Sequence, residues 1–92
     1  MTAVQGGTEK DVRVEVRAFI EDNFLYMSPD VELGDGDDLL AAGIIDSLGF
    51  VELVEEVESR YGVPVADIEI TEENFGSIDS IVRYVERKRA AP

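Results

Sequence analysis

Ser47 is the residue of this chain whose setting most invites a chemical role. The stretch Ala41–Leu53, which reads AAGIIDSLGFVEL, places it between an apolar run and the start of an acidic helix. The chain has no histidine and no cysteine, which excludes a Ser-His-Asp hydrolase and zinc sites built on histidine or thiolate. Serine, threonine, tyrosine, carboxylates and two lysines remain for chemistry. Ser47 therefore needs a role other than that of a nucleophile activated by histidine.

The predicted position of Ser47 suits a phosphate group. Asp46 is a good N-cap, so Ser47 falls at the first position of a helix, among unpaired backbone N–H groups at the positive end of the helix dipole. Such a position favours a bound or attached phosphate. Serine is also common at helix starts for capping alone, and spacing by itself favours that plainer interpretation.

Helical periodicity and capping signals predict the elements that hold this serine. Thr8 is a candidate N-cap for a first helix over about 9–24, and residues 25–45 form a long loop with no sustained period. The second helix runs from the Asp46 cap to about residue 61, where Gly62 ends it. A short third helix follows Thr71 and ends near Gly76. Ser77 can cap a fourth helix, whose last turn is basic.

These elements predict an all-α fold: a four-helix bundle with a long first loop and a short third helix. No segment alternates in the way a strand would. We expect one domain over 1–92, with flexible tails at 1–8 and 90–92. The loop is expected to attach to the core through Leu25, Val31, Leu33, Leu39, Leu40, Ile44 and Ile45. The predicted core residues of the helices are Phe19, Ile20, Phe50, Val54, Val57, Ile81, Val82 and Val85.

The charge of the chain is strongly negative and unevenly distributed. The net charge is -13, and no basic residue falls between Ala18 and Ser59. This argues against nucleic-acid and anionic-membrane binding and favours a basic protein partner, although an acidic surface that only maintains solubility would look the same. There is no signal peptide pattern and no apolar run of transmembrane length, so a cytoplasmic protein is expected.

The second helix has two contrasting faces. Its core face is predicted to carry Phe50, Leu53, Val54, Val57 and Tyr61. The opposite face carries Leu48, Glu52, Glu55 and Glu56, with Val51 and Glu58 on the flank. Leu48 should therefore be an exposed apolar residue among carboxylates, and we interpret it as a candidate contact for a partner.

The stretch Gly43-Ile44-Ile45-Asp46-Ser47-Leu48, followed by Val51-Glu52-Leu53, resembles the phosphopantetheine attachment motif of acyl carrier proteins. The likeness extends to Asp38-Leu39-Leu40, to 58–63 and to 78–85, and it covers roughly residues 9–88. It implies that a phosphopantetheinyl transferase attaches 4'-phosphopantetheine from coenzyme A to Ser47. The terminal thiol of the arm would then carry an acyl group as a thioester, and the chain would be a non-catalytic carrier.

The resemblance also implies roles for the neighbours of Ser47. Asp46 would help to position the transferase and its metal. Partner enzymes, including a loading enzyme and downstream synthase or tailoring enzymes, would dock on Leu48, Val51, Glu52, Glu55 and Glu58. Phe50 and Val54 are candidates to line a cleft that takes a short acyl chain, although helix patterning favours simple packing for both. The carrier is expected to be a monomer with no metal of its own.

Three positions depart from the family pattern: Gly49, where an acidic or polar residue is common; Glu55, which is often apolar; and Arg60, which interrupts a run of acids. The segment 70–78 looks more like discrete carriers of specialised metabolism than like primary fatty-acid carriers. We therefore expect an acyl carrier of polyketide or related biosynthesis, as in antibiotic pathways. An aminoacyl or peptidyl carrier of the nonribosomal-peptide type remains the alternative, although Asp46-Ser47-Leu48 differs from the glycine-rich context of peptidyl carrier domains.

Two further alternatives follow from the acidic residues. One is an acidic docking protein without a cofactor. The other is calcium binding between Asp30 and Asp46, although Leu40 falls where an EF-hand loop starting at Asp35 needs glycine.

Overall fold

The computed structural model describes residues 9–28 and 30–90 and is all-helical over them, with no strand. The helices are α1 (Glu9–Phe24), α2 (Ser47–Tyr61), α3 (Glu72–Phe75) and α4 (Ile78–Ala90), with a short 3-10 helix, η1 (Asp67–Glu69), before α3. This confirms the four-helix fold, and η1 is the one element that the sequence patterns do not predict. The predicted Thr8 cap and the tails 1–8 and 91–92 lie outside the described residues, whereas Ala90 is the last residue of α4.

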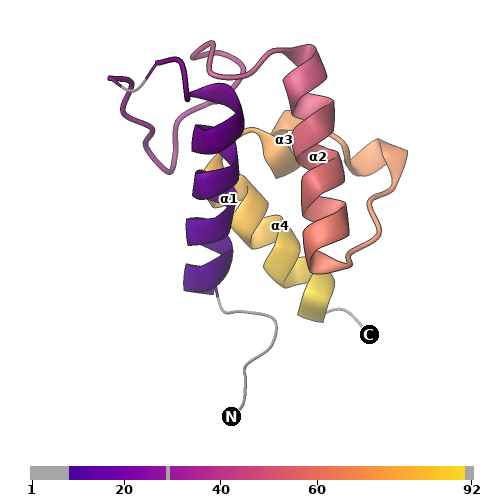
Figure 1. Cartoon of the computed structure of the whole chain (residues 1–92). Helices are drawn as coiled ribbons and strands as arrows, with labels where there is room; N and C mark the ends of the chain where they lie inside the picture. Colours follow the sequence, from indigo (N-terminus) through magenta and orange to yellow (C-terminus); the bar gives the residue numbers. More distant parts are fainter. Residues whose placement is uncertain (1–8, 29, 91–92) are drawn as a thin grey trace.

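The helices α1 and α2 run in opposite directions, so the end of α1 and the start of α2 lie at the same end of the molecule (Figure 1). The helix α4 packs against α1 and crosses behind the pair. None of the helices over the described residues is long and apolar enough to cross a membrane.

The helix ends are fixed by the residues that the sequence singles out. The Asp46 side chain accepts a hydrogen bond from the N–H of Gly49 (2.8 Å), and Thr71 accepts one from the N–H of Asn74 at the start of α3. Ser77 accepts one from the N–H of Ser80 at the start of α4. Gly62 ends α2 with φ of 64°, in the left-handed region that glycine adopts at little cost. The predicted caps Asp46, Gly62 and Ser77 are confirmed, and Thr71, predicted only to precede the third helix, is its N-cap.

The core lies between α1, α2 and α4 and is closed by the loops. Phe75 and Tyr84 are fully buried and pack together with ring centroids 4.8 Å apart. Six of the eight predicted core residues are buried. Phe19 and Phe50 are only half-buried, because they pack against the outside of the buried cluster. Of the loop anchors, Leu25, Leu33, Leu39 and Ile45 are buried, Leu40 and Ile44 are half-buried, and Val31 is 46% exposed, so its expected role as an anchor is wrong.

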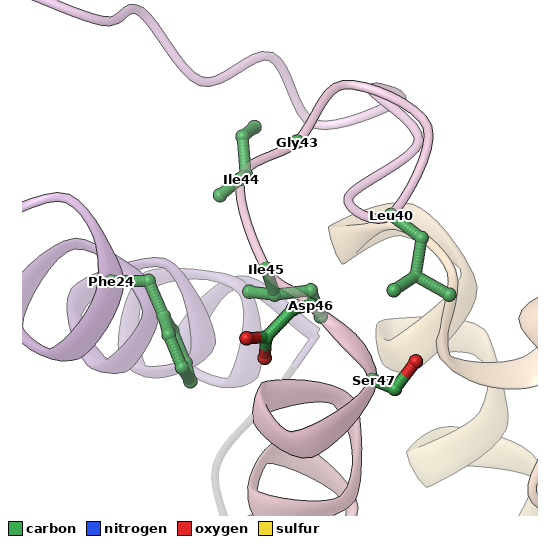
Figure 2. A pocket seen from close by; sticks show the side chains of 7 residues that line it. All are labelled: Phe24, Leu40, Gly43, Ile44, Ile45, Asp46 and Ser47. Carbon is green, nitrogen blue, oxygen red and sulfur yellow. The ribbon is translucent and has the colours of Figure 1, made fainter.

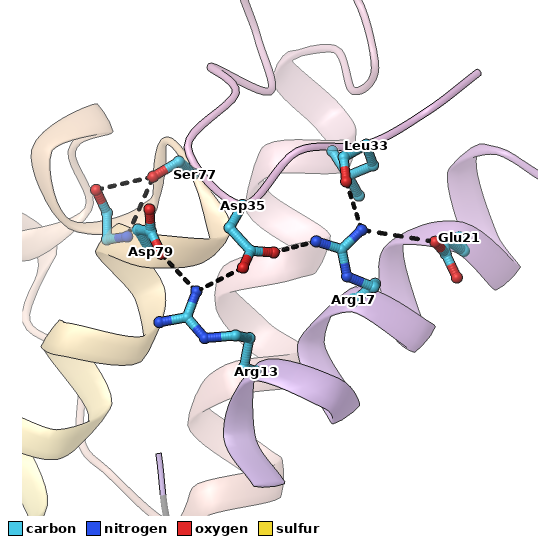
Figure 3. Close-up of polar contacts among 8 residues, drawn as sticks. Arg13, Arg17, Glu21, Leu33, Asp35, Ser77 and Asp79 are labelled. Atoms are coloured by element: carbon cyan, nitrogen blue, oxygen red, sulfur yellow. Dashed lines mark hydrogen bonds and ion pairs between the residues drawn. The ribbon is translucent and has the colours of Figure 1, made fainter. Parts of the chain in front are cut away.

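Hydrogen bonds and ion pairs attach the long loop to α1 and α4 (Figure 3). Asp35 accepts hydrogen bonds from Arg13 and Arg17 of α1, and Arg13 also binds Asp79 at the start of α4. Arg17 donates to the backbone oxygen of Leu33 as well. The hydrogen bond from Arg17, with further help from Arg13, lowers the pKa of Asp35 from its ordinary value of 3.8. The loop is therefore fixed by charge as well as by its buried leucines.

Candidate functional site

Ser47 is the first residue of α2 and its side chain is exposed, as the sequence predicts. The first intrahelical hydrogen bond runs from the N–H of Phe50 to the oxygen of Asp46 (2.8 Å), and the Asp46 side chain takes the N–H of Gly49. The N–H groups of Ser47 and Leu48 come before that bond, so the helix itself does not use them. The helix start thus combines an accessible hydroxyl with two backbone donors, which fits a phosphate ester.

The loop before α2 is tightly folded and delivers Ser47 to this position. The Asp38 side chain accepts from the N–H groups of Leu40 and Ala41, and the oxygen of Leu39 accepts from Ile44 and Ile45. Gly43 has φ of 75°, a backbone conformation that favours glycine. The N–H of Leu39 in turn donates to the oxygen of Gly76 (2.8 Å), so the loop is tied to the α3–α4 corner.

An open hollow of about 510 Å³ lies beside Ser47 (Figure 2). Phe24, Leu40, Ile44 and Asp46 are among its lining residues. The side chains of Asp46 and Ser47 leave the backbone on opposite sides, with the Ser47 hydroxyl on the Leu40 side (Figure 2). Sequence reasoning missed this hollow, and Gly43 is the signal that could have pointed to the turn that shapes it.

Gly49 is buried because α2 begins directly against the end of α1. A Cβ built on Gly49 would lie 2.8 Å from Cε1 of the Phe24 ring. The departure from the family pattern at this position therefore has a packing reason: Phe24 occupies the space that a side chain would need.

The exposed face of α2 carries the predicted docking residues. Leu48 is 67% exposed and Val51 is 48% exposed, and Glu52, Glu55 and Glu58 are exposed on the same helix. The structure therefore places all five on the surface, two apolar residues among three carboxylates. Arg60, which interrupts the acidic run, is paired with Glu56 one turn earlier, so it adds little positive charge to this face.

A smaller hollow of about 180 Å³ lies between α2 and the segment around η1. Its walls combine apolar side chains, Val51, Val54, Val65 and Ile70, with the carboxylates of Glu55, Glu58 and Asp67. Val54 lines this hollow, whereas Phe50 lies outside its lining and packs edge-on against Phe75, with ring centroids 6.4 Å apart.

Three aspartates of the long loop are used as acceptors within the protein. Asp35 binds the two arginines, Asp37 accepts from the N–H of Gly34, and Asp38 accepts from two backbone N–H groups. Over residues 9–28 and 30–90 there is no cluster of three or more side chains arranged to hold a metal ion. Asp35, Asp37 and Asp38 are therefore engaged by donors within the protein.

Comparison with known proteins agrees with this geometry. The family model described as a phosphopantetheine attachment site matches residues 12–85. The D-alanyl carrier protein of Streptococcus thermophilus is 36% identical over 81 residues, which cover 88% of this chain and 99% of the relative. The corresponding protein of Streptococcus sanguinis is 35% identical over the same shares of both chains. That of Streptococcus pyogenes is 37% identical over 67 residues, covering 73% of this chain and 84% of the relative.

These relatives are carriers, and nothing among them supports the expected assignment to polyketide or antibiotic biosynthesis; they stand closer to the aminoacyl alternative. The match spans most of the chain, so it identifies the chain as a whole as a carrier that a transferase modifies, and not as an enzyme. The chain belongs to the acyl carrier protein family, and its cofactor is a covalently attached 4'-phosphopantetheine.

Proposed function

We propose that this chain is a free-standing carrier in which Ser47 bears the phosphopantetheine arm and the cargo is a small aminoacyl group. The observation that carries the attachment site is the exposed Ser47 hydroxyl at the start of α2, within the family match. The thiol at the end of the arm holds the cargo as a thioester. During attachment the Ser47 oxygen loses its proton and bonds to the pantetheine-side phosphorus of coenzyme A, while the pyrophosphate bond breaks and adenosine 3',5'-bisphosphate leaves. The N–H groups of the first turn stabilise the negative charge of the resulting phosphodiester.

The assignment of the cargo is supported by the D-alanyl carrier proteins, which align over nearly their whole length. The hollow between α2 and η1 is consistent with it. At about 180 Å³ it has roughly the liquid volume of six water molecules, and the core beneath it is closed. Its carboxylates, Glu55, Glu58 and Asp67, would attract the ammonium group of an aminoacyl thioester. A long acyl chain would have to displace buried side chains such as Val54.

We assign the docking role to the exposed face of α2, on which Leu48 and Val51 lie among Glu52, Glu55 and Glu58. Its partners would be a phosphopantetheinyl transferase, an aminoacyl-loading enzyme and the enzymes that take the cargo onward. Asp46 would stay in its capping role and would also lie beside the metal of the transferase. Because coenzyme A is the source of the arm, we place the modification in the cytoplasm, and we expect the carrier to act as a monomer.

Intact mass spectrometry tests the attachment site. The purified protein is incubated with coenzyme A and a broad-specificity transferase, and the expected result is a gain of one phosphopantetheine in the wild type and none in Ser47→Ala. Ser59→Ala, an exposed serine on the same helix, is the matched control and should gain the arm normally. A gain that persists in Ser47→Ala would show that another residue is modified.

The cargo is tested on protein purified from its native host. Tandem mass spectrometry ejects the arm with its thioester, and we expect the mass increment of a small amino acid such as alanine. An increment that corresponds to a malonyl or longer acyl group would overturn the aminoacyl assignment and restore the polyketide alternative. Loss of loading in Glu52→Lys together with Glu55→Lys, with arm and fold intact, would support the docking face.

A further inference from the structure

Part of the lining of the hollow beside Ser47 is apolar. The direction in which these side chains point affects where the phosphopantetheine arm can lie. Leu40 and Ile44 pack against the core on one side and are only half-buried, so the rest of each side chain faces solvent. Leu40 projects from the loop toward the side of the backbone on which the Ser47 hydroxyl lies (Figure 2). The structure thus holds an apolar surface within the lining that Ser47 shares.

This wall is held in place by the backbone of the loop. The Leu40 N–H donates to the Asp38 side chain (3.1 Å), and the oxygen of Leu40 accepts from the N–H of Gly43 (3.1 Å). Leu39 beside it is fully buried. A ligand group that packs on Leu40 would therefore meet a surface that is already ordered, and little conformational entropy would be lost on contact.

Charge distinguishes the two sides of the attachment point. The Asp46 carboxylate lies on the side opposite the Ser47 hydroxyl, toward Phe24, where its Oδ1 caps the helix (Figure 2). A phosphodiester on Ser47 carries a negative charge, and repulsion from Asp46 disfavours a path on that side. On the Leu40 side the nearest carboxylate is that of Asp38, which lies outside the lining of the hollow and is engaged by the N–H groups of Leu40 and Ala41.

We propose that the inner part of the arm lies against Leu40, on the side of the backbone where the Ser47 hydroxyl lies, with the paired methyl groups next to the phosphodiester packed on the Leu40 side chain. The proposal rests on Ser47 as the attachment site. These methyl groups are the most apolar part of the arm close to the phosphate, and burying them on Leu40 removes apolar surface of both from water. Leu40 is thus a positioning residue for the arm, which starts from a defined direction before a partner binds.

The test uses the modified wild-type protein, with its arm confirmed by intact mass, and measures contacts by NMR. We expect nuclear Overhauser effects between the paired methyl groups of the arm and the methyl groups of Leu40. The Leu40 methyl resonances should also shift on modification by more than those of Ile68, which is 85% exposed on η1. Leu40→Ser should abolish the contacts and give the arm the relaxation of a free chain, and Leu40→Met should retain slow relaxation. Ile68→Ser is the control and should change neither readout.

Three outcomes separate this inference from the proposed function. Arm contacts with Val51 and Ile70 alone would show that the arm lies in the smaller hollow and would overturn the inference. Averaged, contact-free methyl signals in the modified protein would also overturn it. A failure to gain the arm at all, seen in the mass spectrum before any NMR, would overturn the attachment site itself.

Discussion

Two connections join the helices of this bundle: residues 25–46 link α1 to α2, and residues 62–77 link α2 to α4. In each connection one carboxylate accepts hydrogen bonds from several donors. In the long connection Asp35 receives Arg13 and Arg17, whose side chains are about 30% exposed. In the short connection Glu69 receives the N–H of Ala66, the hydroxyl of Tyr84 and the ammonium of Lys88.

The two carboxylates have partners of different kinds. The two α1 arginines that bind Asp35 lie near the surface, whereas Tyr84 is fully buried and packs at a tilt against the buried Phe75. Ion pairs near the surface are screened by salt and contribute little, whereas buried aromatic packing contributes several kcal/mol. The connection beside Ser47 is therefore anchored in the core by aliphatic side chains and attached to α1 by ion pairs, whereas the connection on the far side of α2 is anchored by the aromatic side chains of Phe75 and Tyr84.

The largest expected effect is that of Phe75→Ala, which should lower the free energy of unfolding by about 3–5 kcal/mol because a fully buried ring is removed. Leu33→Ala in the long connection, where Leu33 is 7% exposed, should cost less, about 2 kcal/mol. Urea unfolding followed by far-UV circular dichroism measures both. An equal or greater loss in Leu33→Ala would contradict the contrast between the two connections.

Tyr84→Phe isolates the polar contact of the short connection and should cost about 1.5 kcal/mol, because a hydrogen bond to a carboxylate is lost while the ring stays. Burial, together with the hydrogen bond to Glu69, raises the pKa of Tyr84 from 10.0 to about 12. Since the folded state favours the neutral phenol, this contribution is complete below pH 10 and is lost as the pH rises toward 12.

The alkaline measurement compares the unfolding free energies of wild type and Tyr84→Phe across that range. Their difference should shrink as the pH rises from 10 to 12. A difference that stays constant would show that the Tyr84 hydroxyl does not carry the contact.

The two N-caps at the ends of the connections offer a smaller comparison. Asp46→Ala should cost about 1 kcal/mol, because it leaves the N–H of Gly49 without its partner at the start of the long helix α2. Thr71→Ala should cost about 0.5 kcal/mol, since its longer contact with Asn74 (3.2 Å) caps only the four residues of α3. Thermal unfolding checks both, and a larger effect at Thr71 would reverse the order.

The smallest effect is expected from Asp35→Asn, because its arginine partners are partly exposed. The lowered pKa of Asp35 means that its contribution is complete above the ordinary value of 3.8 and is lost as the pH falls further below it. The stability difference between wild type and Asp35→Asn should therefore vanish in acid and shrink with added salt. Glu32→Gln, an exposed acid of the same loop, is the control, and a wild-type difference that survives both acid and salt would rule out the ion pairs.

Local signals were sufficient to predict the four α-helices and most of their ends, although not the 3-10 helix η1. Asp46, Gly62, Thr71 and Ser77 each act within a few residues of themselves, so their roles can be read from neighbouring positions. The exposure of Leu48 follows equally from helical spacing. The position of Ser47 at the first residue of α2 belongs to the same class of inference.

Features that depend on distant residues could not be predicted in this way. The link from Arg13 to Asp79 joins α1 to α4, and no spacing rule connects residues so far apart in the chain. The half-burial of Phe50 depends on where Phe75 packs against it, which is likewise set by the assembled fold. The hollow beside Ser47 arises where the 39–45 turn meets the end of α1, so its apolar wall became visible only in three dimensions.

The close approach of Phe24 to Gly49 has a consequence for how this chain can change by mutation. Alanine at position 49 would favour the helix by about 1 kcal/mol, yet its Cβ would press on the ring, 2.8 Å from Cε1. A smaller residue at position 24, as in Phe24→Leu, would relieve that pressure, so the two changes should be less costly together than the sum of their separate effects. Positions 24 and 49 are therefore expected to change in concert among close homologues, with a bulky residue at one accompanied by a small residue at the other.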